Sequence, residues 1–178
     1  MKMYLALLRG INVSGKNIIL KQDLQVLFYN LGFEDVVTYI QSGNVVFKTE
    51  KQHLDGLAKT ISSRIKKVFD YDVPVIIKTK ADMESVIAKN PFLKEKDVNI
   101  KQLYVFYLDE VPEETINLLN YNIANDQFEI LKNIIYVKYD IGAGKSKLSN
   151  NLIEKKLNVI ATARNWRTTT KLLALMEK

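Results

Sequence analysis

The 178-residue sequence contains no cysteine and a single histidine, His53. Without cysteine the chain cannot form disulfides, use a thiolate in catalysis or bind a metal through sulfur. A metal site built on His53 would need carboxylates for all its other ligands, which is unusual for zinc. We therefore expect no metal and no cofactor, and we expect His53 to be a solvent-facing residue at the start of a helix.

Long apolar segments are also missing. No stretch approaches the ~20 apolar residues that a membrane-spanning helix needs. The apolar run at the N-terminus is interrupted by Arg9 and is followed by no small-residue cleavage site, which indicates a strand and not a signal peptide. These features together predict a cytoplasmic protein that has no membrane partner.

Arginine is scarce in a basic chain. The formal net charge of +6 favours anionic partners such as nucleic acid, although an excess of lysine also promotes solubility. Only four of the 26 basic residues are arginines, and the guanidinium group differs from lysine in binding carboxylate or phosphate at two points. Arg64 lies in an ordinary helix pattern. The other three, Arg9, Arg164 and Arg167, fall in predicted loops of unusual composition.

Hydrophobic periodicity predicts the order of strands and helices. In the first 80 residues it predicts a strand at 3–8, a helix at 23–31, strands at 36–40 and 45–47, a helix at 53–69 and a strand at 73–78. After these come a helix at 82–89, a strand at 103–108, a helix at 112–119, strands at 127–131 and 134–139, a helix at 147–157, a strand at 159–162 and a helix at 165–177.

This order is βαββαβ, and it occurs twice. It predicts an α+β protein with two successive ferredoxin-like halves, antiparallel sheets and a C-terminal helix. We place the first half at 1–80, a linking helix and connection at 81–100, and the second half with the C-terminal helix at 101–178. The first strand of each half is apolar on both faces, while the helices of this fold cover only one face. The halves should therefore pack together, or the protein should dimerise.

The topology brings the first candidate site together, because the first strand ends beside the turn between the second and third strands. The candidate ligand-binding residues there are Arg9, Gly10, Asn12, Gly15, Lys16, Gln41, Ser42, Gly43 and Asn44. They combine cations, amides and backbone that glycine leaves accessible. The alternative is structural: the glycines serve tight turns and the asparagines satisfy loop backbone.

A second candidate site lies where the third and fourth strands of the second half end together. Each strand leads into a helix, and a helix N-terminus has free N–H groups and a positive dipole end that suit an anion. The candidate residues are Gly144, Lys145, Ser146, Lys147, Arg164, Asn165, Trp166 and Arg167. In the structural alternative Trp166 packs under the sheet and the arginines pair with carboxylates. A phosphate loop would need glycine where Tyr139 stands, so ATP hydrolysis is not expected.

Four segments carry a resemblance to a known family: LLRGINVSGKN at 7–17, TYIQSGNVVF at 38–47, GAGKSKL at 142–148 and TARNWRT at 162–168. They look like the bacterial family called domain of unknown function 1697, over nearly the whole chain. The resemblance implies a duplicated ferredoxin-like protein with no assigned activity, and it transfers no catalytic residue. The family commonly has two glycines where this chain has Ser14 and Gly15.

The leading functional hypothesis is the binding of a phosphate-bearing ligand, either a nucleotide or a nucleic acid, at these loops. Two alternatives stay open. One is an enzyme of unassigned class with its site at Arg9 and residues 41–44, although the sequence offers no paired nucleophile and base and therefore no named catalytic residue. The other is a homodimeric interaction module.

Overall fold

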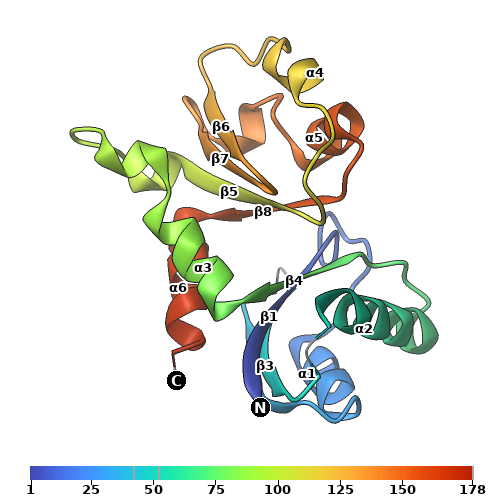
Figure 1. Ribbon diagram of the computed structural model, residues 1–178. Helices are drawn as coiled ribbons and strands as arrows, with labels where there is room; N and C mark the ends of the chain where they lie inside the picture. Colours follow the sequence, from blue (N-terminus) through green and yellow to red (C-terminus); the bar gives the residue numbers. More distant parts are fainter. Residues whose placement is uncertain (42, 52, 178) are drawn as a thin grey trace. The chain divides into compact units, whose positions relative to one another are not determined.

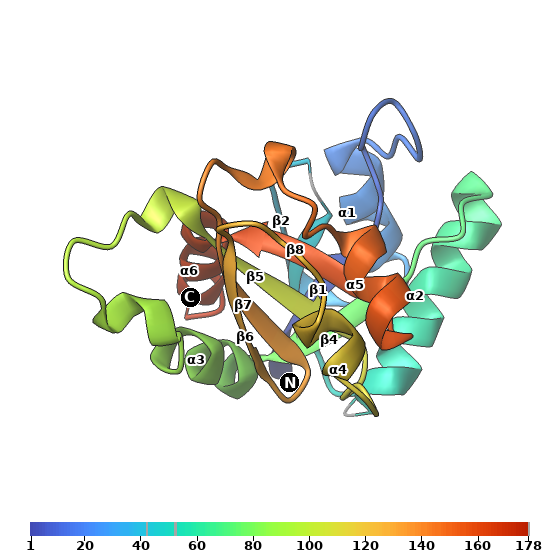
Figure 2. The same cartoon turned by 90° about the horizontal axis from the view of Figure 1, so that it is seen from above.

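The computed structural model of the chain describes residues 1–41, 43–51 and 53–177, which divide into two compact units. The first unit comprises Met1–Glu84 with Lys171–Lys178, and the second comprises Ser85–Thr170. Each unit has a four-stranded antiparallel sheet with helices packed on it (Figure 1; Figure 2 gives the view from above). Both boundaries between the units fall within helices, α3 and α6.

The first unit has the strand order β2-β3-β1-β4. Its elements are β1 (Lys2–Leu8), α1 (Lys21–Tyr29), β2 (Glu34–Tyr39), β3 (Asn44–Thr49), α2 (Leu54–Phe69), β4 (Val75–Thr79) and the first part of α3 (Lys80–Ala88). Helices α1 and α2 lie side by side on one face of the sheet (Figure 1). Their apolar sides cover a core in which the Phe47 ring stacks on Phe33 at 4.6 Å and meets Phe28 edge-on at 5.3 Å. Leu5 and Leu7, which point to the opposite face, are buried as well.

The second unit repeats this arrangement with the order β6-β7-β5-β8. Its elements are η1 (Pro91–Lys94), η2 (Ile100–Gln102), β5 (Leu103–Leu108), α4 (Ile116–Leu119), β6 (Gln127–Leu131), β7 (Ile134–Lys138), η3 (Ala143–Lys145), α5 (Asn150–Leu157), β8 (Ala161–Asn165) and α6 (Trp166–Leu175). Helices α4 and α5 cover one face of this sheet (Figure 1). On the other face the Tyr136 hydroxyl donates to the Val86 carbonyl at 3.0 Å, so the end of α3 packs on β7.

The α+β class and the two successive ferredoxin-like units are confirmed. Most predicted elements begin or end at other residues than predicted, and three of these differences matter for the second candidate site and its surroundings. The helix predicted at 112–119 is only Ile116–Leu119, because the Asp109 carboxylate accepts from the backbone N–H groups of Glu110 and Ile160 and holds the preceding chain in a turn. The helix predicted at 147–157 begins at Asn150, where the Ser149 side chain caps it. The strand predicted at 159–162 is Ala161–Asn165, so Arg164 lies in a strand opposite Val105 and not in a loop.

The two units share a hydrogen-bond pattern where their first strands end. The Leu8 N–H donates to the Gly43 carbonyl at 2.8 Å, and the Leu108 N–H donates to the Asn133 carbonyl at 3.0 Å. In each unit the backbone N–H of the next residue donates to a carbonyl just before the fourth strand. The Arg9 N–H donates to the Pro74 carbonyl at 2.9 Å, and the Asp109 N–H donates to the Ile160 carbonyl at 3.1 Å. The same topological position therefore carries a cation in the first unit and a carboxylate in the second.

Gly43 fills its position for two separate reasons. Its φ of +74° is a left-handed conformation, and a Cβ built on it would lie 2.7 Å from the Leu8 Cβ and 3.0 Å from the Ile11 side chain. Real Cβ atoms essentially never approach other atoms that closely. The turn between β2 and β3 can therefore pack against the end of β1 only when residue 43 lacks a side chain.

We predict that Gly43→Ala lowers the free energy of unfolding by about 2 to 4 kcal/mol, from the left-handed backbone and the overpacking together. Gly32→Ala is the matched control, because Gly32 has a φ of +77° and nothing within 4 Å of a built Cβ. That variant should lose only about 1 to 2 kcal/mol. Urea unfolding of both variants measures the difference, and equal losses would contradict the close approach of Gly43 to Leu8.

Candidate functional site

Asn12 joins the two loops of the first candidate site. Its Nδ2 donates to the Ile19 carbonyl at 3.0 Å and to the Gln41 carbonyl at 2.7 Å, while its Oδ1 accepts from the Ile19 N–H at 2.9 Å. The residue has a φ of 54°, a left-handed conformation that asparagine tolerates better than most residues. The two loops therefore meet at one end of the sheet, as the topology predicted, and the Asn12 side chain is committed to holding them there.

Between Asn12 and Asn17 the chain makes a tight turn. The Asn12 N–H donates to the Asn17 carbonyl at 3.2 Å, and the Lys16 N–H donates to the Val13 carbonyl at 3.0 Å. The two tip residues, Ser14 and Gly15, have φ values of 50° and 75°, the positive signs that a type I′ turn requires. Ser14 thus adopts the left-handed backbone at the first tip position of this turn.

The tip of this turn presents donors to solvent. Within the residues that the structure describes, the backbone N–H groups of Ser14 and Gly15 donate to no acceptor. Both tip residues and Lys16 are exposed, and Arg9 is half-buried at the base of the loop. No aspartate or glutamate occurs in residues 9–17 or 41–44. The loop is therefore positive in charge and has backbone donors at its tip.

The other predicted residues of this site have mixed roles. Asn44 is buried, and its Nδ2 donates to the Tyr39 carbonyl at 3.1 Å, which closes the turn between β2 and β3. Gly10 has a φ of 76° and its carbonyl accepts from Asn17 Nδ2 at 3.0 Å, so it serves the fold of the loop. Gln41 is exposed, and Ser42 lies outside the described residues. Among the predicted residues of this site that the structure describes, Lys16 and Gln41 have exposed side chains and Arg9 is half-buried.

The loop after β7 is organised by a residue that the sequence analysis missed, Asp126. Its carboxylate accepts from the Asp140 N–H at 2.9 Å and from the Ser146 hydroxyl, while Ser146 Oγ accepts from the Leu148 N–H at 2.8 Å. Ser146 is thereby engaged within the protein. Asp126 directly precedes β6, which pairs with β7. The predicted hairpin of these two strands was therefore the signal in the sequence that could have placed Asp126 beside the loop after β7.

The helix starts of the second site are also largely satisfied. The Leu152 N–H donates to Ser149 Oγ at 3.3 Å in α5, and the Thr168 N–H donates to Asn165 Oδ1 at 2.8 Å in α6. Strands β7 and β8 do end together, since Lys138 and Asn165 lie opposite neighbouring residues of β5. The exposed predicted residues here are Gly144, Lys145, Lys147, Asn165 and Arg167.

Arg164 and Trp166 are buried in the second unit. Arg164 is 7% exposed, and its Nη1 donates to Thr162 Oγ1 and to the Ala163 carbonyl, both at 2.8 Å. Trp166 is 5% exposed. The carboxylates of Asp126 and Asp140 lie in the same loop region and oppose an anion there. These observations favour the structural interpretation of Arg164 and Trp166.

Burial displaces the pKa values of three tyrosines in the second unit. Burial raises the pKa of Tyr136 to about 12, and it raises the pKa of Tyr107 and Tyr139 further. Each hydroxyl has an internal partner, for example the Leu148 carbonyl at 2.8 Å from Tyr139. Tyrosines that stay neutral and hydrogen-bonded in a core stabilise the fold and offer no general base.

Residues 1–41, 43–51 and 53–177 contain neither a metal-binding cluster nor a membrane-spanning helix. No three side chains of the histidine, cysteine or carboxylate type lie close enough together there to hold a metal ion. None of the helices in those ranges is long and apolar enough to cross a bilayer.

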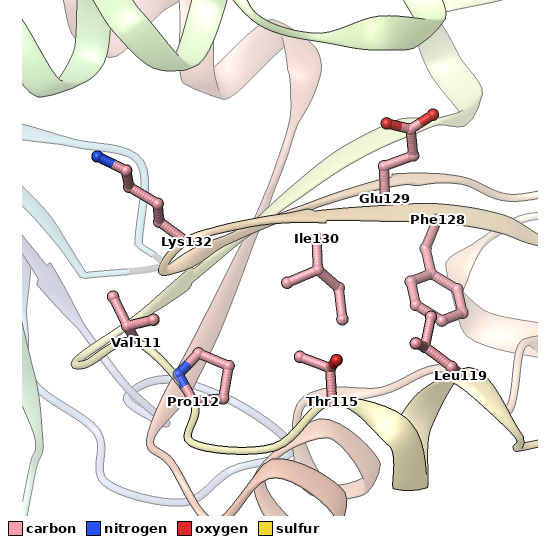
Figure 3. Close-up of a pocket in the computed structure, with 8 residues that line it drawn as sticks. All are labelled: Val111, Pro112, Thr115, Leu119, Phe128, Glu129, Ile130 and Lys132. Carbon is pink, nitrogen blue, oxygen red and sulfur yellow. The ribbon is translucent and has the colours of Figure 1, made fainter.

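The second unit also has an apolar groove of about 460 Å³ beside its edge strand β6. Figure 3 shows Phe128 and Ile130 pointing from β6 toward Thr115 and Leu119, while Glu129 points away. Val111, Pro112 and Lys132 complete the lining. Val111 and Leu119 are each more than half exposed, so the groove is an apolar patch open to solvent.

We predict that Asn12→Asp lowers the free energy of unfolding by about 2 to 3 kcal/mol, because two N–H donors are lost and a carboxylate faces two carbonyl oxygens. Asn17→Asp is the control, since it loses one hydrogen bond and should cost about 1 kcal/mol. Both variants tolerate the left-handed backbone. Urea unfolding midpoints measure the effect, and an Asn12→Asp protein as stable as Asn17→Asp would show that Asn12 does not join the loops.

Comparison with known proteins supplies a family and a fold. The sequence model of a family described as "Protein of unknown function (DUF1697)" matches residues 1–136. A solved structure of a conserved bacterial protein from Streptococcus pneumoniae is similar in fold, with a TM-score of 0.70, 21% sequence identity and coverage of 98% of both chains. No curated protein matches this chain in sequence. The chain belongs to the DUF1697 family.

Proposed function

We propose that this protein binds a small phosphate-bearing ligand of the nucleotide class at the first-strand loop, defined as residues 9–17. The observation that carries the proposal is the tip of the turn, where the N–H groups of Ser14 and Gly15 and the Lys16 ammonium group are open to solvent with no carboxylate in the loop. Phosphate oxygens accept hydrogen bonds from backbone N–H groups and are attracted by lysine as a point charge.

The bracing of the loop supports this proposal. Asn12 and Asn17 hold both sides of the turn through hydrogen bonds to backbone carbonyls. Donors that are fixed before the ligand arrives cost less conformational entropy on binding than donors on a mobile loop. A turn with two tip residues has room for one phosphate group, which favours a nucleotide over a nucleic-acid backbone at this loop. The proposal places the protein in the cytoplasm, with its nucleotides.

The electrostatic contrast between the units also favours the first-strand loop. The corresponding position after β5 is Asp109, while the loop after β7 contains Asp140 and is hydrogen-bonded to the Asp126 carboxylate. A phosphate near those carboxylates would meet like charge, which opposes its binding. We therefore place the anion at Arg9 and Lys16 in the first unit, ahead of the loops that contain Lys145 and Arg167.

Binding is a better-supported function than catalysis for the first-strand loop. Of the residues that the enzyme hypothesis needs, Asn44 and Gly43 serve the fold. Residues 9–17 contain no histidine, aspartate or glutamate that could act as a general base beside the Ser14 hydroxyl.

We predict that Lys16→Gln weakens binding of adenosine diphosphate by at least about tenfold, the loss of one hydrogen bond to a charged group. Lys101→Gln removes the same charge from an exposed site in the second unit and should leave the affinity unchanged. Isothermal titration calorimetry of the wild type and both variants makes the comparison. Equal losses in the two variants, or no binding by the wild type, would contradict the proposal.

A second candidate function, a homodimeric interaction module, is favoured by the edge of β6. Leu131 and Ile134 flank the two-residue turn of the β6–β7 hairpin and form a hydrogen-bonded pair. In an antiparallel ladder hydrogen-bonded pairs alternate with non-hydrogen-bonded pairs, so Ile130 and Phe128 belong to non-hydrogen-bonded pairs. The N–H and C=O groups of Phe128 and Ile130 therefore face away from β7, above the apolar groove in Figure 3. An exposed edge of this kind can pair with the same strand of a second copy.

For this candidate we predict concentration-dependent dimers in sedimentation velocity, with Ile130→Pro remaining monomeric because proline lacks the outward N–H. Ile130→Val keeps that group and should dimerise as the wild type does. A wild-type protein that sediments as a monomer at every concentration would contradict the second candidate.

A further inference from the structure

A basic groove runs along α2 in the first unit, on the side of the helix next to Leu31, and is remote in sequence from the first-strand loop. It has a volume of about 430 Å³ and is lined by Leu31, Lys59, Thr60, Ser63, Arg64 and Lys67. All of these residues except Leu31 belong to α2, and Leu31 follows the end of α1. The lining contains three cations and two hydroxyl groups but no carboxylate.

The cations of this groove are not neutralised by the protein. Within the described part of the chain, Lys59, Arg64 and Lys67 take part in no ion pair. The neighbouring Lys66 differs, because its Nζ lies 2.9 Å from Asp70 and 3.0 Å from Asp72. The carboxylates of Asp70 and Asp72 therefore neutralise the Lys66 ammonium group, whereas the Lys67 ammonium group lines the groove without a carboxylate partner among the described residues.

Arg64 adds a more specific observation. Its Nε is buried away from solvent and has no hydrogen-bond partner among the described residues. A buried donor without an acceptor is destabilising, and more so when the group is charged. Arg64 itself is half-buried and lines the groove, so its side chain is held in place there and its positive charge has no carboxylate partner among the described residues.

The spacing of the cations indicates the shape of the ligand. Lys59 and Lys67 lie about 12 Å apart along the helix axis at about 1.5 Å per residue, with Arg64 between them. One phosphate group cannot reach both ends of such a row, but a chain of phosphates can. The hydroxyl groups of Thr60 and Ser63 face the same groove and can donate to phosphate oxygens, as serine and threonine do along nucleic-acid backbones.

We propose that the α2 groove binds the phosphodiester backbone of a nucleic acid. This function is separate from nucleotide binding at the first-strand loop, because the two sites share no residue. Contacts to phosphates carry no base sequence information, so the groove should bind different sequences with similar affinity. A free oligophosphate has similar chemistry, and the test must distinguish it from a phosphodiester chain.

The test measures the affinity of a fluorescein-labelled DNA duplex by fluorescence anisotropy at several salt concentrations. Three phosphate contacts predict that the logarithm of the association constant falls against the logarithm of salt with a slope of about −2.7, at about −0.9 for each contact. Lys67→Gln should reduce the slope to about −1.8 and weaken binding at low salt by at least about tenfold. Lys66→Gln, with the same change of charge one residue away, should change neither quantity.

Arg64→Lys tests the arginine itself, since it keeps the charge and removes the planar guanidinium group. It should leave the salt slope unchanged and weaken binding severalfold. Equal effects of Lys66→Gln and Lys67→Gln, or wild-type affinity in Arg64→Lys, would overturn the assignment. Displacement of the duplex by pyrophosphate, where chloride at the same ionic strength does not displace it, would also overturn the nucleic-acid claim in favour of a free oligophosphate.

The outcome does not depend on the first-strand loop. Lys16→Gln should bind the duplex as the wild type does, and Lys67→Gln should keep its affinity for adenosine diphosphate. Loss of duplex binding in Lys16→Gln to the same extent as in Lys67→Gln would overturn the separate groove while leaving the first-strand loop as the phosphate site.

Discussion

The contact between Gly43 and Leu8 is the constraint on which the first-strand loop depends. The Leu8 N–H reaches the Gly43 carbonyl at 2.8 Å, and no side chain fits between the two residues. This close approach fixes where β1 stops pairing and where the chain must leave the sheet. Asn12 then spans to Gln41 at 2.7 Å and braces the loop from its other side. Backbone donors at the tip of the turn are thereby held in place before any ligand arrives.

The two units build different chemistry on the same backbone plan. Leu8 and Leu108 make equivalent hydrogen bonds, but the residues that follow are Arg9 and Asp109. In the second unit the Asp109 carboxylate accepts from the Ile160 N–H at 2.9 Å, and Asp126 organises the loop after β7. Charge at the strand ends, and not the topology, thus distinguishes the two units.

Sequence periodicity predicted the fold class and the meeting of the first two loops, because strand order follows from element order. It did not predict that Arg164 lies in β8, since alternating polar residues at the end of a strand resemble a loop. The hydrogen bonds of Asp126 to Asp140 and Ser146 depend on the pairing of β6 with β7, which local sequence patterns do not describe. Arg64 matched a helix face, and only its tertiary surroundings show that its Nε lacks an acceptor.

We propose that a phosphate group binds at the tip of the first-strand loop. A crystal grown with adenosine 5′-O-(1-thiodiphosphate) tests this most directly, because anomalous scattering from the ligand's sulfur atom locates the phosphate group. The sulfur atoms of the protein's methionines give anomalous peaks at known positions and serve as a control. The account predicts a sulfur peak within hydrogen-bond reach of the backbone N–H groups of Ser14 and Gly15 and near Lys16. A ligand peak at the Lys145 and Arg167 loops, with none at residues 9–17, would contradict it.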